Sequence, residues 1–419
     1  MKSPISPVAT GDGAVNAVAV PFNIRHGVQF EVMGLQLDFA DSFAHYNTAG
    51  IGLKWTTAGG AIETNPSRVR TGLQSLRIQA GDSPTKVLNG DGYNLVGFGW
   101  QTEVLSGETI VNLISSGASP TSQLYLVQNS DGSISLWSGQ GPTLLATSAP
   151  GVLTVNAWYA IEINVQQIPA FVGPVQCIVT VTPAVGTVTQ IINVTGFVTS
   201  DTSWDTLEWG GPAAPYHAWV ADFYFMADWD SLGDPLALLG APQIYGRCVP
   251  LADGLDHVSF NTIGKTIAFP GTAAPWWSQV NEIPQNSAAP IFETDESVTN
   301  PGTIGGWIVC GQCFQIDVST VPVGSAIAAL QVTILYGATA GTNRNNSVPS
   351  QFVHYTGTPS NYFVSGGGNA WNIAPNTTLP FKFYEFGLVA NPITNLPWVL
   401  AEFSGASALQ VGPFVGEPA

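Results

Sequence analysis

The stretch that decides the fold is residues 156–165, NAWYAIEINV, in which apolar and polar side chains alternate. The apolar members share every second position: Tyr159, Ile161, Ile163 and Val165. Glu162 and Asn164 lie between them. Side chains along a β-strand point alternately to opposite faces, so a period of two predicts a strand with one face in a core.

The same alternation recurs on both sides of this stretch. It is found in residues 175–181, VQCIVTV, and again in residues 330–336, LQVTILY. Asp131-Gly132 separates LYLVQNS from SISLW, which is typical of a β-hairpin turn. Because 46 glycines and 30 prolines divide the chain into short segments, the sequence predicts an all-β protein of two β-sandwich, jelly-roll-like domains.

We divide the chain by where the strand patterns begin and end. Residues 1–34 form a Gly/Ala/Val/Pro-rich N-terminal arm without strand patterning, and residues 35–235 form a first sandwich. Residues 236–258 are expected to be a connector, and residues 259–419 a second β-domain. The arm is a candidate docking segment for another subunit.

Charge limits the partners that the chain can have. Only 9% of its residues are charged, and the formal net charge is −17. Binding to a nucleic-acid backbone or to an anionic membrane surface needs clustered Lys and Arg, so both are disfavoured. No apolar run is long enough for a membrane helix. The N-terminus has no apolar signal-peptide core, which would fit assembly inside a host cell followed by lysis.

The first half resembles the concanavalin-A-like, laminin-G-like jelly-roll domain. The resemblance rests on the order of its segments from Leu37 to Asp230: LDFADSF, RVRTGLQSLRI, GFGWQTEV, LYLVQNSDGSISLW, NAWYAIEINV, CIVTVTP and WVADFYFMADWD. The last of these is similar to the closing strand of the family, with its acidic residue at Asp222.

The second half resembles a C-terminal module that follows such a domain in some virion proteins of tailed bacteriophages. The segments that carry this likeness are GDPLALLGAPQIYGRCVPLADG, WWSQVNEIP, SAIAALQVTILYGATAGT and NPITNLPWVLAEFSGASALQVG. The resemblance implies a virion protein of a tail, fibre, neck or capsid surface. It also implies that the partners are other virion subunits in a homo-oligomer, with a glycan as a further ligand.

Hydrolases of the concanavalin-like superfamily carry an ExDxxE motif that places carboxylates on one strand face. The comparable strand here has Glu162, with Asn164 in place of the middle acid and no second glutamate. We therefore expect no catalytic residues and no enzyme activity, and we expect Glu162 to be solvated. A secreted glycan hydrolase remains the third alternative, behind a structural subunit and a carbohydrate-binding adhesin.

Acidic residues gather towards the end of the first half. They are Asp201, Asp205, Glu208, Asp222, Asp228, Asp230 and Asp234. Calcium needs several oxygen ligands that converge on one point, and strand alternation sends neighbouring acids to opposite faces. We expect turn-capping or solvated acids and no cofactor or metal site, with calcium as the alternative.

Aromatic residues offer the only candidate glycan site. Trp204, Trp209, Tyr216 and Trp219 are close together in a chain that has 13 tryptophans. Exposed aromatic rings can stack on sugar rings, whereas buried ones pack a core or a subunit interface, and the second interpretation is favoured. The four cysteines, Cys177, Cys248, Cys310 and Cys313, are too few for a disulfide scaffold. Cys310 and Cys313 form a CxxC in an apolar strand pattern and are expected to be buried thiols.

Overall fold

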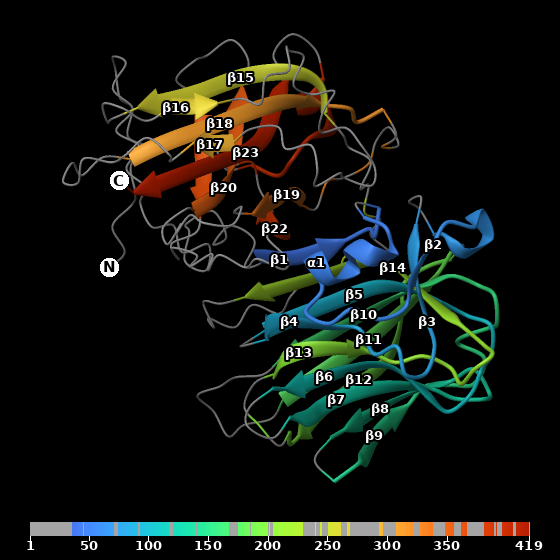
Figure 1. The fold of residues 1–419 in the computed structure, drawn as a ribbon. Coiled ribbons are helices and arrows are strands. Elements are labelled where there is room, and N and C mark those ends of the chain that lie inside the picture. The colour runs from blue at the N-terminus through green and yellow to red at the C-terminus, as the bar shows by residue number, and fades with distance from the viewer. Residues whose placement is uncertain are drawn as a thin grey trace. The chain divides into compact units, whose positions relative to one another are not determined.

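The computed structural model divides the chain into two compact units, Gly34–Gly246 and Arg247–Ala419 with Met1–Met33 (Figure 1). The residues that it describes are 36–44, 46–70, 74–90, 93–116, 120–139, 141–166, 175–184, 186–199, 201, 204–228, 239, 244, 250–260, 266–268, 293–295, 307–319, 321, 325, 327, 329–337, 348–355, 362–366, 381–388, 391, 396–404 and 408–418. The expected N-terminal arm, residues 1–34, lies outside them.

The unit Gly34–Gly246 contains a large antiparallel sheet in the order β12-β11-β10-β5-β14-β3-β2, and β1 also pairs with β14. Its strands are β1 (Gln36–Asp41), β2 (Ala61–Glu63), β3 (Ser75–Ile78), β5 (Tyr93–Thr102), β10 (Tyr159–Gln166), β11 (Val175–Pro183), β12 (Thr189–Phe197) and β14 (Ala218–Asp228). The long strands β5 and β14 are therefore flanked by other strands on both sides.

A second antiparallel sheet has six strands in the order β4-β13-β6-β7-β8-β9. They are β4 (Thr85–Gly90), β6 (Glu108–Ser115), β7 (Thr121–Gln128), β8 (Ile134–Ser138), β9 (Thr143–Thr147) and β13 (Trp204–Trp209). The turn between β7 and β8 contains Asp131-Gly132, with Gly132 at φ 78°, so the predicted hairpin is confirmed.

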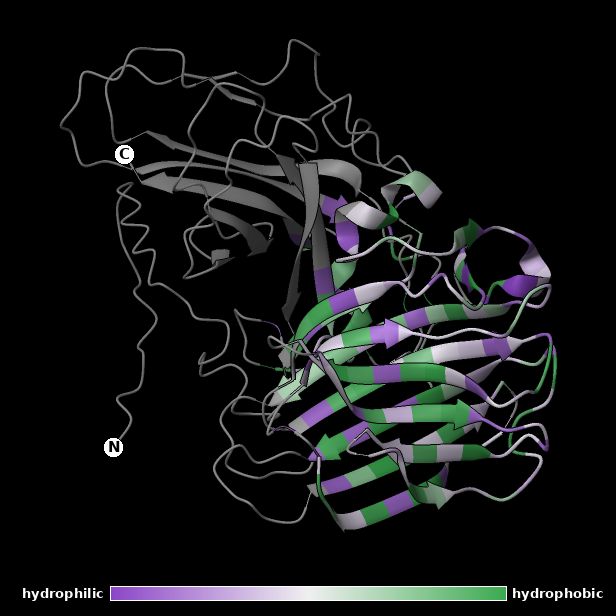
Figure 2. Cartoon of the chain, turned by 60° about the horizontal axis from the view of Figure 1, so that its bottom comes forward, coloured by the Kyte–Doolittle hydropathy of each residue, from purple (hydrophilic) through white to green (hydrophobic). Residues whose placement is uncertain are grey.

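The two sheets form a sandwich with an aromatic core between them. Trp209 of the six-stranded sheet lies 4.8 Å, ring centroid to centroid, from Phe98 of the eight-stranded sheet and 5.4 Å from Phe223. Figure 2 shows hydrophobic and hydrophilic residues alternating along many of these strands, as a period of two requires. The predicted core positions in β10, from Tyr159 to Val165, are all buried.

The second unit is also built from strands. Its described strands form a five-stranded sheet, β15-β18-β23-β20-β21, and two pairs, β16-β17 and β19-β22. They are β15 (Pro250–Phe260), β16 (Thr266–Ala268), β17 (Glu293–Asp295), β18 (Trp307–Ile316), β19 (Leu330–Gly337), β20 (Val348–Tyr355), β21 (Tyr362–Gly366), β22 (Phe381–Leu388) and β23 (Leu409–Pro418). The all-β prediction is thus confirmed for the described residues of both units.

One detail differs from the sequence analysis. β15 starts at Pro250 and pairs with β18, so the last part of the expected connector, residues 236–258, is a strand. The segment LGAPQIYGRCVPLADG is typical of a connector, but pairing with a strand distant in sequence is not visible in such a local pattern. Helical structure among the described residues is short: η3 (Thr48–Gly50), α1 (Ile51–Lys54), η4 (Pro66–Arg68) and η6 (Leu400–Phe403). None of the helices in this part of the chain is long and apolar enough to cross a membrane.

Candidate functional site

The three tryptophans of the predicted glycan site are buried. Trp204, Trp209 and Trp219 are at most 2% exposed. Trp204 packs edge-on against Phe225, with ring centroids 5.4 Å apart. A ring without an accessible face cannot stack on a sugar, so the alternative of core packing describes Trp204 and Trp209. Tyr216 alone of the four is exposed, at 47%.

Trp219 is buried from the other side of the eight-stranded sheet. Its neighbour in the chain, Val220, is directly opposite Trp100. The ring nitrogen of Trp100 donates a hydrogen bond to Gln128 of the six-stranded sheet, so the side chains of Trp100 and Val220 face the core. Trp219 is therefore on the outer face, directly opposite Gln101. The Arg68 guanidinium carbon lies 4.1 Å from the centroid of the Trp219 indole and covers it.

Arg68 is positioned by the short helix η4. The Asn65 side chain accepts a hydrogen bond from the Ser67 amide at 3.1 Å, and Pro66 begins the turn. The Arg68 carbonyl accepts a hydrogen bond from the Ser75 hydroxyl at 2.6 Å, which joins this turn to β3. The guanidinium therefore lies over the sheet in a fixed position.

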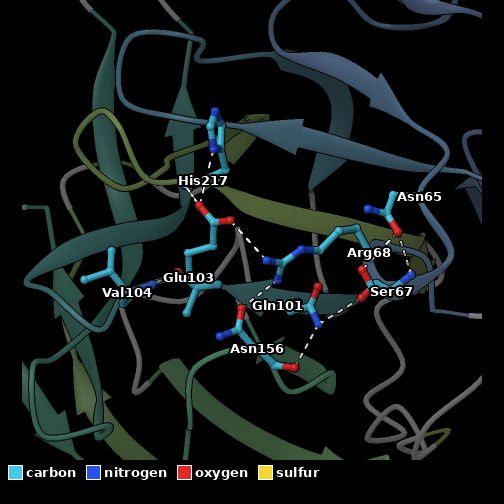
Figure 3. Close-up of polar contacts among 9 residues, drawn as sticks. Asn65, Ser67, Arg68, Gln101, Glu103, Val104, Asn156 and His217 are labelled. Carbon is cyan, nitrogen blue, oxygen red and sulfur yellow. Dashed lines mark hydrogen bonds and ion pairs between the residues drawn. The ribbon is translucent and has the colours of Figure 1, made fainter.

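A polar network surrounds this guanidinium on the outer face (Figure 3). Arg68 Nη2 is 3.1 Å from a carboxylate oxygen of Glu103, and Arg68 Nη1 donates to Asn156 Oδ1 at 2.7 Å. The second Glu103 oxygen accepts from the His217 amide at 3.0 Å and lies 3.3 Å from His217 Nδ1. Together with Gln101 and Trp219, these four residues are called the Glu103 network. The Arg68, Glu103 and His217 side chains are 21–29% exposed, so solvent reaches all three.

Within the Glu103 network, one side-chain atom of Gln101 and one of Trp219 are buried without a hydrogen-bond partner among the described residues. Gln101 donates through Nε2 to the Asn156 carbonyl at 3.0 Å, but its Oε1 has no hydrogen-bond partner among the described residues. The same holds for the indole Nε1 of Trp219. Gln101 is 3% exposed and Trp219 2%. Because buried polar atoms are normally paired, this acceptor and this donor mark a place in the network where a further polar group would be accommodated.

A second polar cluster lies on the same face, over β5. Glu162 and Tyr224 are both directly opposite Gly97, one from each neighbouring strand. The Tyr224 hydroxyl donates to Glu162 Oε1 at 2.6 Å. Asp222, at a register shift of β14, pairs with Arg70 at 2.8 Å. These four residues are called the Glu162 cluster.

The prediction that Glu162 is solvated was wrong, since Glu162 is 1% exposed. Its carboxylate accepts hydrogen bonds from Tyr224, from the Leu239 amide at 2.7 Å and from Thr180 at 3.4 Å. Period-two alternation correctly placed Glu162 away from the core, but the alternation does not report what covers the outer face. The Ile244 amide similarly donates to Asp222 at 3.2 Å.

Burial and the Glu162 charge together hold the pKa of Tyr224 well above its usual value. The Tyr224 hydroxyl therefore keeps its proton and remains a donor to Glu162. Because the Glu162 and Asp222 side chains are at most 2% exposed and hydrogen-bonded, they belong to the packing of the unit. The accessible chemistry of this face is that of the Glu103 network.

The acidic residues near the end of the first half are used one at a time. Asp201 accepts a hydrogen bond from Ser115 at 2.7 Å, Asp205 from Ser116 at 2.7 Å, and Glu208 from Asn112 at 3.5 Å. Within the described ranges, no group of three or more His, Cys, Asp or Glu side chains could hold a metal ion. The side chains of Asp228, Asp230 and Asp234 lie outside the described residues.

Of the four cysteines, Cys177 is described with its side chain. It is buried and free, and burial raises its pKa to about 12. The side chains of Cys248, Cys310 and Cys313 are not among those described.

The sequence analysis missed Arg68, Gln101, Glu103 and His217 as members of one site. One signal was present: Asn65-Pro66-Ser67 marks the start of a helical turn. This signal does not identify the partners of Arg68, because the members of the site come from segments far apart in the chain.

Comparison with known proteins finds solved structures that resemble part of the chain at low TM-scores. A cellulose-induced protein matches with a TM-score of 0.33 at 12% identity, over 45% of this chain and 96% of that one. An alginate lyase from Aplysia kurodai matches with a TM-score of 0.30 at 14% identity, over 39% and 86% of the two chains. A Bacillus subtilis protein of unknown function with a galectin-like fold has a TM-score of 0.30 at 10% identity, over 45% and 94%.

No family model and no curated protein matches the chain in sequence.

Proposed function

We propose that the unit Gly34–Gly246 binds carbohydrate at the Glu103 network, without turning it over. The observation that carries the proposal is the partly exposed arrangement of Arg68, Glu103 and His217 above the two unpaired atoms of Gln101 and Trp219. The jelly-roll resemblance and the carbohydrate-binding alternative from the sequence point in the same direction.

The chemistry of the network suits a ligand rich in hydroxyl groups. A hydroxyl both donates and accepts, so it can bond a guanidinium, a carboxylate and an amide that lie side by side. Arg68 and Glu103 balance each other in charge, and their contacts with Asn156 and His217 fix both side chains before a ligand arrives. Such a site favours a neutral saccharide over an ion, and little ordering is needed on binding.

Binding without turnover follows from the carboxylates. Glycoside hydrolysis uses two carboxyl groups that flank the scissile bond. In the network, Glu103 is the single carboxylate, while Glu162 is covered by Tyr224 and the Leu239 amide. We therefore propose a binding protein, for which no cofactor is required, so chelation of calcium should leave binding unchanged.

The test is a glycan array with the full chain, followed by calorimetry on the strongest ligand. Glu103→Gln keeps the shape of the side chain but removes the charge that holds Arg68 and His217, and we expect affinity to fall at least about tenfold. Asp131→Asn is the matched control, because it removes an exposed carboxylate from the β7–β8 turn and keeps an oxygen for Ser133. Equal affinities of Glu103→Gln and the parent chain, or an array without any ligand, would reject the proposal.

We further propose that this binding unit is carried by a subunit of a phage virion. The proposal rests on the sequence, in which only 9% of residues are charged. Burying an uncharged polar side chain against a neighbouring subunit costs less free energy than burying a charged one. Antibody labelling of purified particles in the electron microscope tests it, and label confined to the unassembled fraction would contradict it.

A further inference from the structure

We infer that the outer face of the six-stranded sheet carries a second, separate binding surface for a neutral polysaccharide chain. The surface is a row of side chains, one from each of five neighbouring strands, which we call the transverse row. Its members are Glu208 (β13), Asn112 (β6), Tyr125 (β7), Trp137 (β8) and Leu144 (β9). It shares no residue with the Glu103 network, so the two proposals stand independently.

Strand register brings the transverse row together. Glu208 is directly opposite Asn112, Asn112 opposite Tyr125, Tyr125 opposite Trp137, and Trp137 opposite Leu144. Directly opposed residues of antiparallel strands project from the same face. Figure 1 shows β13, β6, β7, β8 and β9 following one another across this sheet.

The row points away from the core. Leu124 and Leu126 on either side of Tyr125 are 2% and 1% exposed, and Leu207 and Trp209 beside Glu208 are fully buried. The members of the row are instead partly exposed, and Leu144 is 48% exposed. Alternation along each strand therefore leaves these five side chains to the solvent.

The centre of the row is an aromatic pair. The rings of Tyr125 and Trp137 lie within 7° of parallel, with centroids 6.1 Å apart. Their indole and phenol groups, with Leu144 beside them, form an apolar strip. The apolar C–H face of a pyranose ring packs on such a strip, because aromatic side chains offer a large contact area at small entropic cost.

Polar groups lie at one end of the strip. Asn112 Nδ2 donates to Glu208 at 3.5 Å, a long bond that a sugar hydroxyl could replace. Asn112 Oδ1 and Trp137 Nε1 are covered by their neighbours and have no hydrogen-bond partner among the described residues. A small rotation of either side chain would present that atom to a ligand hydroxyl.

The length and charge of the row define the class of ligand. Four steps between five strands at about 4.8 Å each span roughly 19 Å, which is long enough for several sugar units in line. The only carboxylate of the row is that of Glu208, which repels acidic polysaccharides. A neutral, extended polysaccharide fits both properties.

Affinity electrophoresis of the full chain in gels with hydroxyethyl cellulose, galactomannan or xyloglucan tests the inference. We expect retardation by at least one of these polymers, and Trp137→Ala and Tyr125→Ala should weaken it at least tenfold. Trp137→Phe, which keeps a ring, should retain most of it. Leu144→Asn changes an exposed side chain without touching the core, and it should weaken binding twofold or more in a folded protein.

The controls separate this surface from the first one. Val188→Ala shortens an exposed apolar side chain before β12 of the other sheet, and it should leave retardation unchanged. Retardation lost in Glu103→Gln but kept in Trp137→Ala would overturn the inference and leave the Glu103 proposal standing. Absence of retardation by all three polymers would also overturn the inference. So would a Trp137→Ala variant that sediments differently but is retarded as the parent chain is, because the row would then be a contact between subunits.

Discussion

Gly97 shows at the scale of one residue how the outer face of the eight-stranded sheet came to hold a buried carboxylate. A Cβ at this position would lie 2.0 Å from the Cζ atom of Tyr224. The missing side chain lets the Tyr224 ring lie flat over β5 and reach Glu162 on the next strand. Gly99 does the same for Arg70, whose Cδ would be 2.7 Å from an added Cβ.

We expect Gly97→Ala to lower the free energy of unfolding by about 1–3 kcal/mol, because the ring must move and its bond to Glu162 is strained. Alanine loses less backbone freedom than glycine on folding, which stabilises the folded chain by about 0.5–1 kcal/mol, so this opposing effect is smaller. Urea denaturation followed by tryptophan fluorescence measures the change. Gly107→Ala is the control, since a Cβ there meets nothing within 4 Å. Equal losses in the two variants would contradict the explanation.

Tyr224 makes a prediction about alkaline pH. Its pKa is raised in the folded protein, chiefly by burial, so above about pH 10 the unfolded chain loses a proton that the folded chain keeps. The stabilisation from Tyr224 is complete below pH 10 and is lost as the pH rises further. Unfolding free energies at about pH 9 and about pH 11 should therefore fall more steeply for the parent chain than for Tyr224→Phe. Parallel pH profiles would show that this hydroxyl is not responsible.

At the scale of elements, β10 shows what a sequence can and cannot predict. Alternation identified the strand and its core face correctly, because that face depends only on the residues of the strand itself. The other face was predicted to be solvated, but it is covered by Tyr224 and by the backbone of Leu239. Whether the second face of a strand is buried depends on which distant segments of the chain pack over it. The residue pattern of one strand does not contain this information.

The candidate glycan site failed for the same reason. Trp204, Trp209 and Trp219 are close in sequence, yet Trp204 and Trp209 belong to the core and Trp219 to the outer face of the other sheet. The Glu103 network is instead assembled from η4, the end of β5, the residue Asn156 and the start of β14. Proximity in sequence was a poor guide because β13 and β14, which follow each other in the chain, belong to different sheets.

The ion pair between Arg70 and Asp222 links two elements, and its removal should be costly. Arg70→Ala leaves the carboxylate of Asp222 in a 2% exposed position with one partner fewer, so we expect a loss of about 3–5 kcal/mol in unfolding free energy. Arg77→Ala removes a partly exposed arginine of β3 and should change stability by less than about 0.5 kcal/mol. Thermal unfolding of both variants provides the comparison, and a loss below about 1 kcal/mol for Arg70→Ala would mean that Asp222 finds another partner.

For the whole molecule, the low fraction of charged residues and the N-terminal arm motivate the hypothesis that the chain assembles with other subunits. We expect that deletion of residues 1–30 leaves the sandwich folded and releases the protein from its assembly, because an apolar arm can lie across a neighbouring subunit. Sedimentation velocity compares the two chains, with circular dichroism to show that the strands persist. If the shortened chain assembles as the parent does, the docking role of the arm is wrong.

The hydrogen bonds from Leu239 and Ile244 to Glu162 and Asp222 have a mechanical consequence. They attach the chain to the side of the sheet after β14 has ended at Asp228. When a force acts on the chain beyond Ile244, the load reaches these two amide–carboxylate hydrogen bonds before it reaches β14. These two hydrogen bonds would break first, and the energy needed to break them would be dissipated before any strand of the sheet is pulled out.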